Sequence, residues 1–449
     1  AFLDKFPPVL LQSFLDSVAD AANEEVKGHV AGFFRAWAAK VSPKDLTSLA
    51  VVDRLVALNE MYPAIYLPLL REVTERASIE ELKLIIGGGV GNGRWATRRG
   101  LVWLMEKMVA FPESFDDAET VLLRLAVAET EPNIGNNATA IFSQIHQIML
   151  SGTAVSFQKR LEKLETRIFS ANHDISDLAL NVLDSVFDPH RMRMAIPPIV
   201  GGRIPPKEWG VEDNLELKNC YDAALAVIEK IFETRDQRLL QKAQKVICDN
   251  CRQLLRLSNG YLDWLRRVIR IDDLTDDLRL KLISEVETYI EYDAEQSPEI
   301  VESVRDWLTV LSPTDFHGKL VTTVGIEPWD KELHGDKNLW KKEIQILALH
   351  LKTHPDDLKK ELQWLCSPAA KSATLLGQEL GLCDCELKLV TIMFDAAKEY
   401  SGYLLIRGYI MGINCACPDR LSEISVIMDS LESSFPELVY QAAEAGGRR

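Results

Sequence analysis

The sequence predicts an all-α protein built from stacked helical hairpins, and two features of its 449 residues lead to this fold class. The first is an apolar period of 3.6 residues in successive windows, the spacing that gathers side chains on one face of a helix. Residues 157–168 show it clearly. Alternating, strand-like runs are scarce, and only LVTTVGI (320–326) is expected to be extended.

The second feature is a proline followed by a polar or acidic residue where new helices are expected to begin. Proline suits the first helical position because its missing N–H would have no partner there, and an acidic residue in that turn meets the positive end of the helix dipole. These starts are expected at Pro43, Pro112, Pro298, Pro355 and Pro436. No strict repeat is present, which is typical of irregular HEAT-like pairs of about 40–50 residues. We therefore predict a HEAT- or armadillo-like helical-hairpin superhelix, an α-solenoid in which neighbouring pairs bury each other's apolar faces.

Two stretches rich in proline and glycine interrupt the helical pattern, at 188–213 and 312–338. Loops of this length inside a compact chain are usually functional or mark a joint. We therefore expect three helical blocks, at 1–187, 214–311 and 339–449, with the two loops between them.

Charge and hydropathy narrow the classes of partner. The net charge is −16, which argues against nucleic acid as the main partner because duplex binders neutralise phosphates with basic side chains. No apolar run approaches the roughly 20 residues of a membrane helix, and the first residues lack the apolar core of a signal peptide. Eight cysteines in a chain this long fit reduced thiols better than a disulfide framework. A cytoplasmic protein without membrane contact is expected.

The glycine-rich run IIGGGVGNGRWATRRG (85–100) raises the question of a phosphate-binding loop. A P-loop needs Lys and Ser/Thr after its last glycine, but Arg94 and Trp95 stand there. The dinucleotide-binding pattern G-x-G-x-x-G also fails in both frames. We interpret the run as a loop between helices and expect no cofactor. The alternative is an anion or partner site made of Arg94, Trp95, Arg98 and Arg99. Arginines at the start of a helix oppose its dipole, so they need an acidic neighbour, most often within the same protein.

Two C-x-C pairs, Cys383/Cys385 and Cys415/Cys417, lie about thirty residues apart. Four thiolates could hold a tetrahedral zinc ion, although structural zinc sites favour a C-x₂₋₄-C spacing. The alternative is that these small side chains fill space between the last helices.

Two tryptophans, Trp209 and Trp329, lie inside the two long loops. Exposed loop aromatics are candidate contacts for a protein partner; the alternative is that each pins its loop to the body. Core packing is expected for most of the tryptophans on apolar helical faces, which are Trp95, Trp103, Trp264, Trp307, Trp340 and Trp364. H-E-x-x-H, G-x-S-x-G and similar catalytic patterns do not occur in the sequence, so we expect no catalytic residues.

A family resemblance is carried by short motifs. One expected helix has L-x-W-x-x-E at 101–106, the next ends in L-A-x-A-E at 125–129, and the turns N-N-A-T and L-S-G-T follow at 136–139 and 150–153. With these motifs, residues 98–168 resemble helical-repeat regions of large bacterial proteins, among them STAND-type NTPases and other antiphage defence proteins. The later GGRIPPKEW (201–209) fits the same resemblance. In such proteins the repeats recognise a trigger or a partner, and the NTPase and effector domains lie elsewhere in the polypeptide.

These observations lead to a functional expectation. We expect a non-catalytic protein-interaction, sensor or scaffold module, with a bacterial defence role implied by the resemblance. The alternative is a regulatory protein that a companion effector, such as a protease, binds or cuts in one of the long loops. A third hypothesis is an enzyme whose helical active site carries no recognisable motif.

Overall fold

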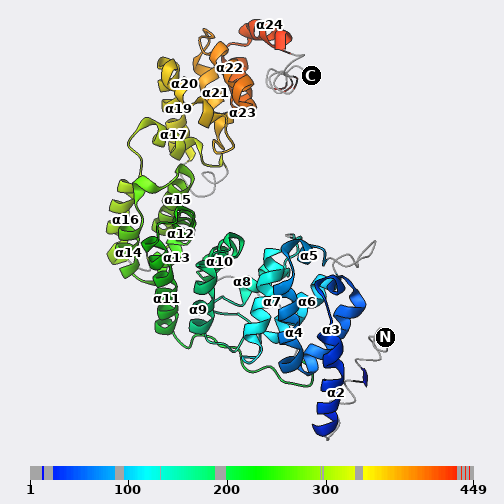
Figure 1. The fold of residues 1–449 in the computed structure, drawn as a ribbon. Coiled ribbons are helices and arrows are strands. Elements are labelled where there is room, and N and C mark those ends of the chain that lie inside the picture. The colour runs from blue at the N-terminus through cyan, green and yellow to red at the C-terminus, as the bar shows by residue number, and fades with distance from the viewer. Residues whose placement is uncertain are drawn as a thin grey trace. The chain divides into compact units, whose positions relative to one another are not determined.

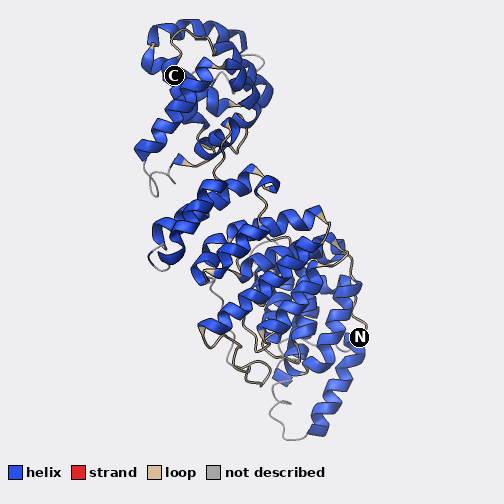
Figure 2. Cartoon of the chain, turned by 90° about the vertical axis from the view of Figure 1, so that its left-hand side faces the viewer, coloured by secondary structure: helices blue, strands red, loops and turns tan. Residues whose placement is uncertain are grey.

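The computed structural model describes residues 13–14, 24–85, 96–131, 133–187, 199–293, 295, 298–328, 337–431, 436, 440 and 444. Over these residues the chain is helical almost throughout, and no strand forms beyond one isolated bridge between Val200 and Arg203. Figure 2 shows the helices in blue. The predicted all-α class is confirmed. No helix in the described part of the chain has the length and apolar character needed to cross a bilayer.

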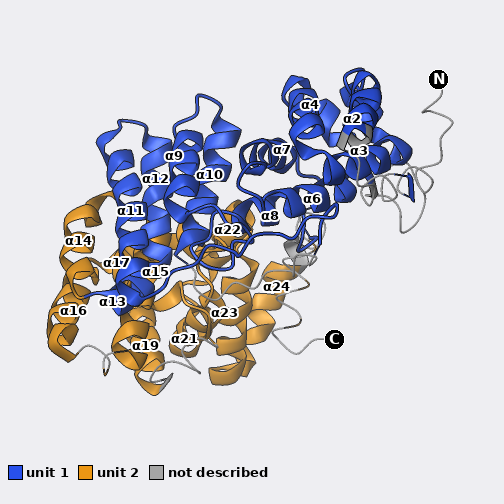
Figure 3. Cartoon of the chain, turned by 90° about the horizontal axis from the view of Figure 1, so that it is seen from below, with its two compact units in different colours: residues 1–258 blue, residues 259–449 orange. Residues whose placement is uncertain are grey.

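The chain divides into two compact units, residues 1–258 and 259–449 (Figure 3). The boundary falls inside the predicted middle block, 214–311, so the compact units do not follow the three blocks expected from loop composition. Each unit is described by itself below.

Unit 1 is a succession of helices joined by turns and by some longer segments (Figure 1). Helix α3 packs on α4 and α6, α4 on α7, α7 on α8 and α10, and α9 on α10 and α11. The predicted stripe at 157–168 is confirmed, because its apolar residues are all buried in α9. The helices are α2 (Glu24–Ala38), η2 (Pro43–Thr47), α3 (Leu49–Met61), α4 (Pro63–Arg76), α5 (Ile79–Lys83), α6 (Ala96–Met108), α7 (Phe115–Val127), α8 (Ala138–Gln144), α9 (Phe157–Ile168), α10 (His173–Val186), α11 (Asn214–Glu233), α12 (Gln237–Asp249) and α13 (Cys251–Leu257).

Unit 2 buries its core between α17 and α24, with Trp340, Leu376, Phe394 and Tyr409 among the buried side chains. Its helices are α14 (Gly260–Val268), η3 (Ile271–Asp273), α15 (Asp276–Tyr292), α16 (Pro298–Leu311), α17 (Phe316–Val324), α19 (Lys337–Thr353), α20 (Pro355–Leu365), α21 (Ala373–Cys383), α22 (Val390–Tyr400), α23 (Tyr403–Ala416), η5 (Pro418–Arg420) and α24 (Leu421–Leu431).

The structure confirms some of the helix starts that were predicted at prolines, but not all of them. Pro298 and Pro355 each begin an α-helix, and Pro43 begins the 3₁₀ helix η2. Pro112 does not begin one, because α7 starts three residues later, at Phe115. Pro436 is described, but the residue that follows it lies outside the described residues.

The extended segment predicted at 320–326 is wrong, and so is the prediction of an unbroken loop over 312–338. Helix α17 occupies Phe316–Val324, and Asp315 caps it by accepting a hydrogen bond from the Gly318 N–H at 2.7 Å. Buried Leu320, Val321 and Val324 share one face. β-Branched residues favour strands only weakly, so packing against α19 decides the conformation.

Helices α21 and α23 approach closely through glycines. A Cβ on Gly377 or Gly381 would collide with α23 backbone at Leu405 and Tyr409, and one on Gly408 or Gly412 would collide with α21 backbone. Gly377 contacts Leu405 and Gly381, one turn later, contacts Tyr409, so the two helices run in parallel. Only glycine permits backbones this close, and the motif holds these two helices in one register.

Candidate binding pocket

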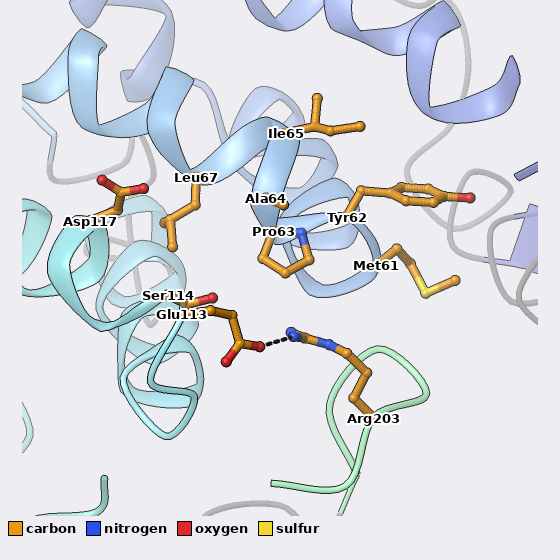
Figure 4. A pocket seen from close by; sticks show the side chains of 10 residues that line it. All are labelled: Met61, Tyr62, Pro63, Ala64, Ile65, Leu67, Glu113, Ser114, Asp117 and Arg203. Atoms are coloured by element: carbon orange, nitrogen blue, oxygen red, sulfur yellow. Dashed lines mark hydrogen bonds and ion pairs between the residues drawn. The ribbon is translucent and has the colours of Figure 1, made fainter. Parts of the chain in front are cut away.

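A pocket of about 330 Å³ opens in unit 1 between the α3–α4 junction, the start of α7 and the segment 199–210, which we call the strap (Figure 4). Figure 1 shows the strap as an extended trace along the ends of the unit 1 helices. The pocket is lined by Met61, Tyr62, Pro63, Ala64, Ile65, Leu67, Glu113, Ser114, Asp117 and Arg203. Its lining is mainly apolar, with charged groups on one side.

The sequence Met-Tyr-Pro shapes the apolar side of the pocket. A residue before proline is pushed out of the helical region, and Tyr62 has φ −131° and ψ 57°. Helix α3 therefore ends at Met61, and α4 begins at once with Pro63. This sharp junction leaves Ala64 exposed and Ile65 half-buried at the pocket.

Ion pairs form the polar side. Asp117, in the first turn of α7, lies 2.5 Å from Nη1 of Arg71. Glu113 precedes α7 and lies 3.2 Å from Nη1 of Arg203. Each carboxylate of the lining therefore has an arginine partner.

Arg203 is placed by a tight turn in the strap. Gly201 has φ +53°, and a Cβ there would collide with the Glu60 carbonyl at the end of α3, so only glycine fits. The Arg203 guanidinium lies over the Phe111 ring at 4.0 Å. Its Nε and Nη2 atoms are buried and have no hydrogen-bond acceptor among the described residues. Burial lowers the pKa of Arg203, and Glu113 partly opposes this effect.

Trp209 holds the other end of the strap. Its ring stacks on Phe157 with centroids 6.4 Å apart and lies 5.5 Å from the Arg160 guanidinium. The main-chain N–H of Trp209 donates to the Thr153 carbonyl at 2.9 Å. Of the two interpretations of this loop tryptophan, its contacts match the one in which it pins the loop to the body.

Arg160 explains why the L-S-G-T turn and the strap lie together. It is fully buried and donates to the carbonyls of Val155 (3.0 Å), Ile145 (2.9 Å) and Gln147. Burial lowers its pKa to about 9. The Gly152 N–H in turn donates to Glu208 of the strap at 2.8 Å. Two motifs of the family resemblance thus meet as parts of one packed structure.

Arg98, one of the candidate partner residues, is buried and paired within unit 1. Its exposed fraction is 1%, and its guanidinium donates to three main-chain carbonyls at 2.7–2.9 Å, those of Leu82, Leu125 and Ala128. Its Nε lies 3.4 Å from the Glu131 carboxylate. The acidic neighbour expected for these arginines is therefore within the protein, and Arg98 closes the C-terminal end of α7.

The remaining candidates either have other surroundings or lie outside the described residues. Arg99 is half-buried and lies over the Trp103 ring at 5.6 Å. Trp103 was expected in the core but is 42% exposed. Arg94, Trp95 and Trp329 lie outside the described residues. The contacts of Arg98 and Arg99 share no residue with those of Trp209, so the predicted residues do not form one site in the described structure.

The cysteines correct one expectation and bear on the zinc alternative. Cys385 and Cys417 form a disulfide with Cα atoms 5.7 Å apart, so the prediction of reduced thiols throughout is wrong for this pair. Cys383 and Cys415 are free. No cluster of three or more metal-ligating side chains occurs in the described part of the chain, so the four sulfur atoms do not gather as a zinc site would require.

Sequence reasoning missed the pocket because its lining comes from three segments far apart in the chain. The signals available were the Tyr-Pro break after an apolar helix and the charged Arg203 in an otherwise apolar turn. Among the described residues that line the pocket there is no histidine or cysteine. An apolar floor with paired charges suits binding better than acid–base chemistry.

Comparison with known proteins adds no relative. The chain matches no protein-family model, and no curated protein and no solved structure is significantly similar to it.

Proposed function

We propose that this chain is a non-catalytic, cytoplasmic protein-interaction module, with its helical hairpins arranged as a HEAT-like solenoid, and that it takes up an apolar anchor residue of a protein partner. The pocket at the α3–α4 junction carries this proposal. Its volume, about 330 Å³, suits one large side chain, and anchors that fill such pockets dominate the binding energy of interfaces. A role in bacterial defence rests on the resemblance of residues 98–168 alone.

The lining supports binding over catalysis. Glu113 and Asp117 are each held by an arginine, so neither is poised to take a proton from a substrate. Ser114 is 4% exposed, and no imidazole lies among the described lining residues to activate it. A nucleophile without a base is weak.

The surroundings indicate the kind of partner. Ile204, next to Arg203 on the strap, is 79% exposed, and Ile199 at its start is 60% exposed, so apolar surface continues beside the pocket. The Glu113 side chain is 62% exposed, and the chain carries a net charge of −16. Charge complementarity favours a basic partner. The expected ligand is a segment with a large apolar residue next to Lys or Arg.

A displayed library of random peptides, selected on the purified chain, tests this proposal. Ala64 is exposed at the pocket and is the second residue of α4, so Ala64→Trp fills the pocket without touching the core. Ala50 is the exposed second residue of α3 outside the pocket, so Ala50→Trp is the matched control. We expect enriched peptides that combine an apolar and a basic residue, bind Ala50→Trp and fail on Ala64→Trp. Peptides that bind both variants equally, or no enrichment, would refute the proposal.

A further inference from the structure

The Cys385–Cys417 disulfide lies where three elements of unit 2 meet. Cys385 follows α21, Cys417 follows α23, and η5 begins at the next residue and leads into α24. Cys385 is exposed and Cys417 is half-buried. Thiols in solution therefore reach the bond, and exposed disulfides are the ones that exchange readily.

Helices α21 and α23 are held together without the disulfide. Their glycines are in backbone contact, and Tyr409 of α23 donates a hydrogen bond of 2.7 Å to the buried carboxylate of Asp384, directly after α21. Asp384 also accepts from the Leu389 N–H at 2.8 Å and so fixes the approach to α22. Breaking the disulfide leaves all of these contacts in place.

Helix α24 depends on the disulfide more directly. Among its described side chains, Ile424 and Met428 belong to the buried apolar core of unit 2. Arg420 of η5 holds the start of the helix in place. Arg420 donates to the Cys385 carbonyl at 3.0 Å and to Glu423, in the first turn of α24, at 2.9 Å. The disulfide links the segment that contains Cys385 to the segment that contains Arg420. It therefore holds the Arg420 guanidinium close to the Cys385 carbonyl.

We propose that Cys385 and Cys417 are a site of reversible thiol modification that controls the docking of α24. In the reducing direction, one thiolate of a dithiol attacks a sulfur of the disulfide, the Cys385–Cys417 bond breaks, and a mixed disulfide forms. The second thiolate of the dithiol then displaces the protein sulfur. Two electrons pass to the protein, both cysteines end as thiols with two protons, and the reductant leaves as a disulfide. Oxidised glutathione reverses the change and leaves as two molecules of reduced glutathione.

Hydrogen–deuterium exchange with mass-spectrometric readout tests this inference on the full chain, first equilibrated with oxidised glutathione and then reduced with dithiothreitol. The disulfide spans 32 residues of sequence, and loss of a loop constraint of this size favours local opening. On reduction we expect exchange in 418–431 to accelerate about tenfold or more. The α21 and α23 amides should keep their protection, because their glycine contacts persist.

Two double variants separate the bonded pair from its neighbours. Cys385→Ser with Cys417→Ser should exchange rapidly in 418–431 with or without dithiothreitol. Cys383→Ser with Cys415→Ser, altered two positions earlier at each site, should keep the wild-type response. The proposal is overturned if reduction leaves exchange in 418–431 unchanged, if α21 and α23 lose protection to the same extent, or if the response disappears in the second variant.

Discussion

Arg203 of the strap and Glu113 before α7 form an ion pair at 3.2 Å across 90 residues of sequence, and this contact closes one side of the pocket (Figure 4). The pair is partly exposed, so its own contribution to stability is small. Its importance is positional: it fixes the guanidinium over Phe111 and holds the exposed Ile204 beside the apolar lining.

The strap should open from its other end when Trp209 is removed. Its stacking on Phe157 and its contact with Arg160 are worth roughly 1–2 kcal/mol. Trp209→Ala should therefore raise the rate of tryptic cleavage after the exposed Lys207 about tenfold. Trp103→Ala, which removes a part-exposed tryptophan from α6, is the control and should leave this rate unchanged. Equal rates in wild type and Trp209→Ala would show that Trp209 does not hold the strap.

Arg98 should be among the most sensitive positions of unit 1. Arg98→Met removes the guanidinium donor from three main-chain carbonyls and the cationic neighbour of the buried Glu131 carboxylate. The free energy of unfolding should fall by about 3 kcal/mol or more. The neighbouring Arg99→Met should change it by no more than about 0.5 kcal/mol. Urea denaturation followed by circular dichroism measures both, and similar losses in the two variants would contradict the assigned role of Arg98.

Glycine substitutions should have opposite effects in two helices. Gly412→Ala drives a methyl group into the α21 backbone, and we expect a loss of about 3 kcal/mol or more because backbone contacts cannot relax as side chains do. Gly32 of α2 has open space around it, so Gly32→Ala should stabilise by about 0.5–1 kcal/mol through helix propensity. Thermal unfolding of both variants measures these changes in stability. A Gly412→Ala protein as stable as wild type would disprove the close approach of α21 and α23.

Whether the sequence predicts a feature depends on how far apart in the chain the interacting residues lie. The helices and the buried face of α9 were predictable because a helical period is local. The helix at 316–324 was not, since its valines and threonines form a helix only through contacts with α19 and through the Asp315 cap. Arg98 lies near the end of the glycine-rich run and Arg203 lies in the first proline- and glycine-rich stretch. Only the fold shows that Arg98 is buried at the end of α7 and that Arg203 lines the pocket.

His317 should make unit 2 sensitive to pH. Its Nδ1 lies 2.5 Å from Glu361 and its Nε2 lies 3.2 Å from Asp276, and only the protonated ring donates to both carboxylates. Burial alone would lower the pKa of His317, but the two carboxylates together outweigh it and raise the pKa above the ordinary 6.5.

A folded-state pKa above the unfolded value means that His317 contributes stability below pH 6.5, and that this contribution is lost as pH rises through the folded-state pKa. The melting temperature of wild type should therefore fall relative to His317→Gln between pH 6 and pH 8. If the melting temperatures of the two proteins change with pH in the same way, His317 does not bind both carboxylates as described.

The central claim is that the pocket accepts an apolar anchor from a protein partner, and photo-crosslinking tests it most directly. A selected peptide carrying benzoylphenylalanine at its apolar position is irradiated with the wild type, Ala50→Trp and Ala64→Trp, and the crosslinks are mapped by mass spectrometry. The account predicts crosslinks to residues 61–67, 113–117 or Arg203 in wild type and Ala50→Trp, and none there in Ala64→Trp. Crosslinks outside these residues, or an unchanged pattern in Ala64→Trp, would contradict it.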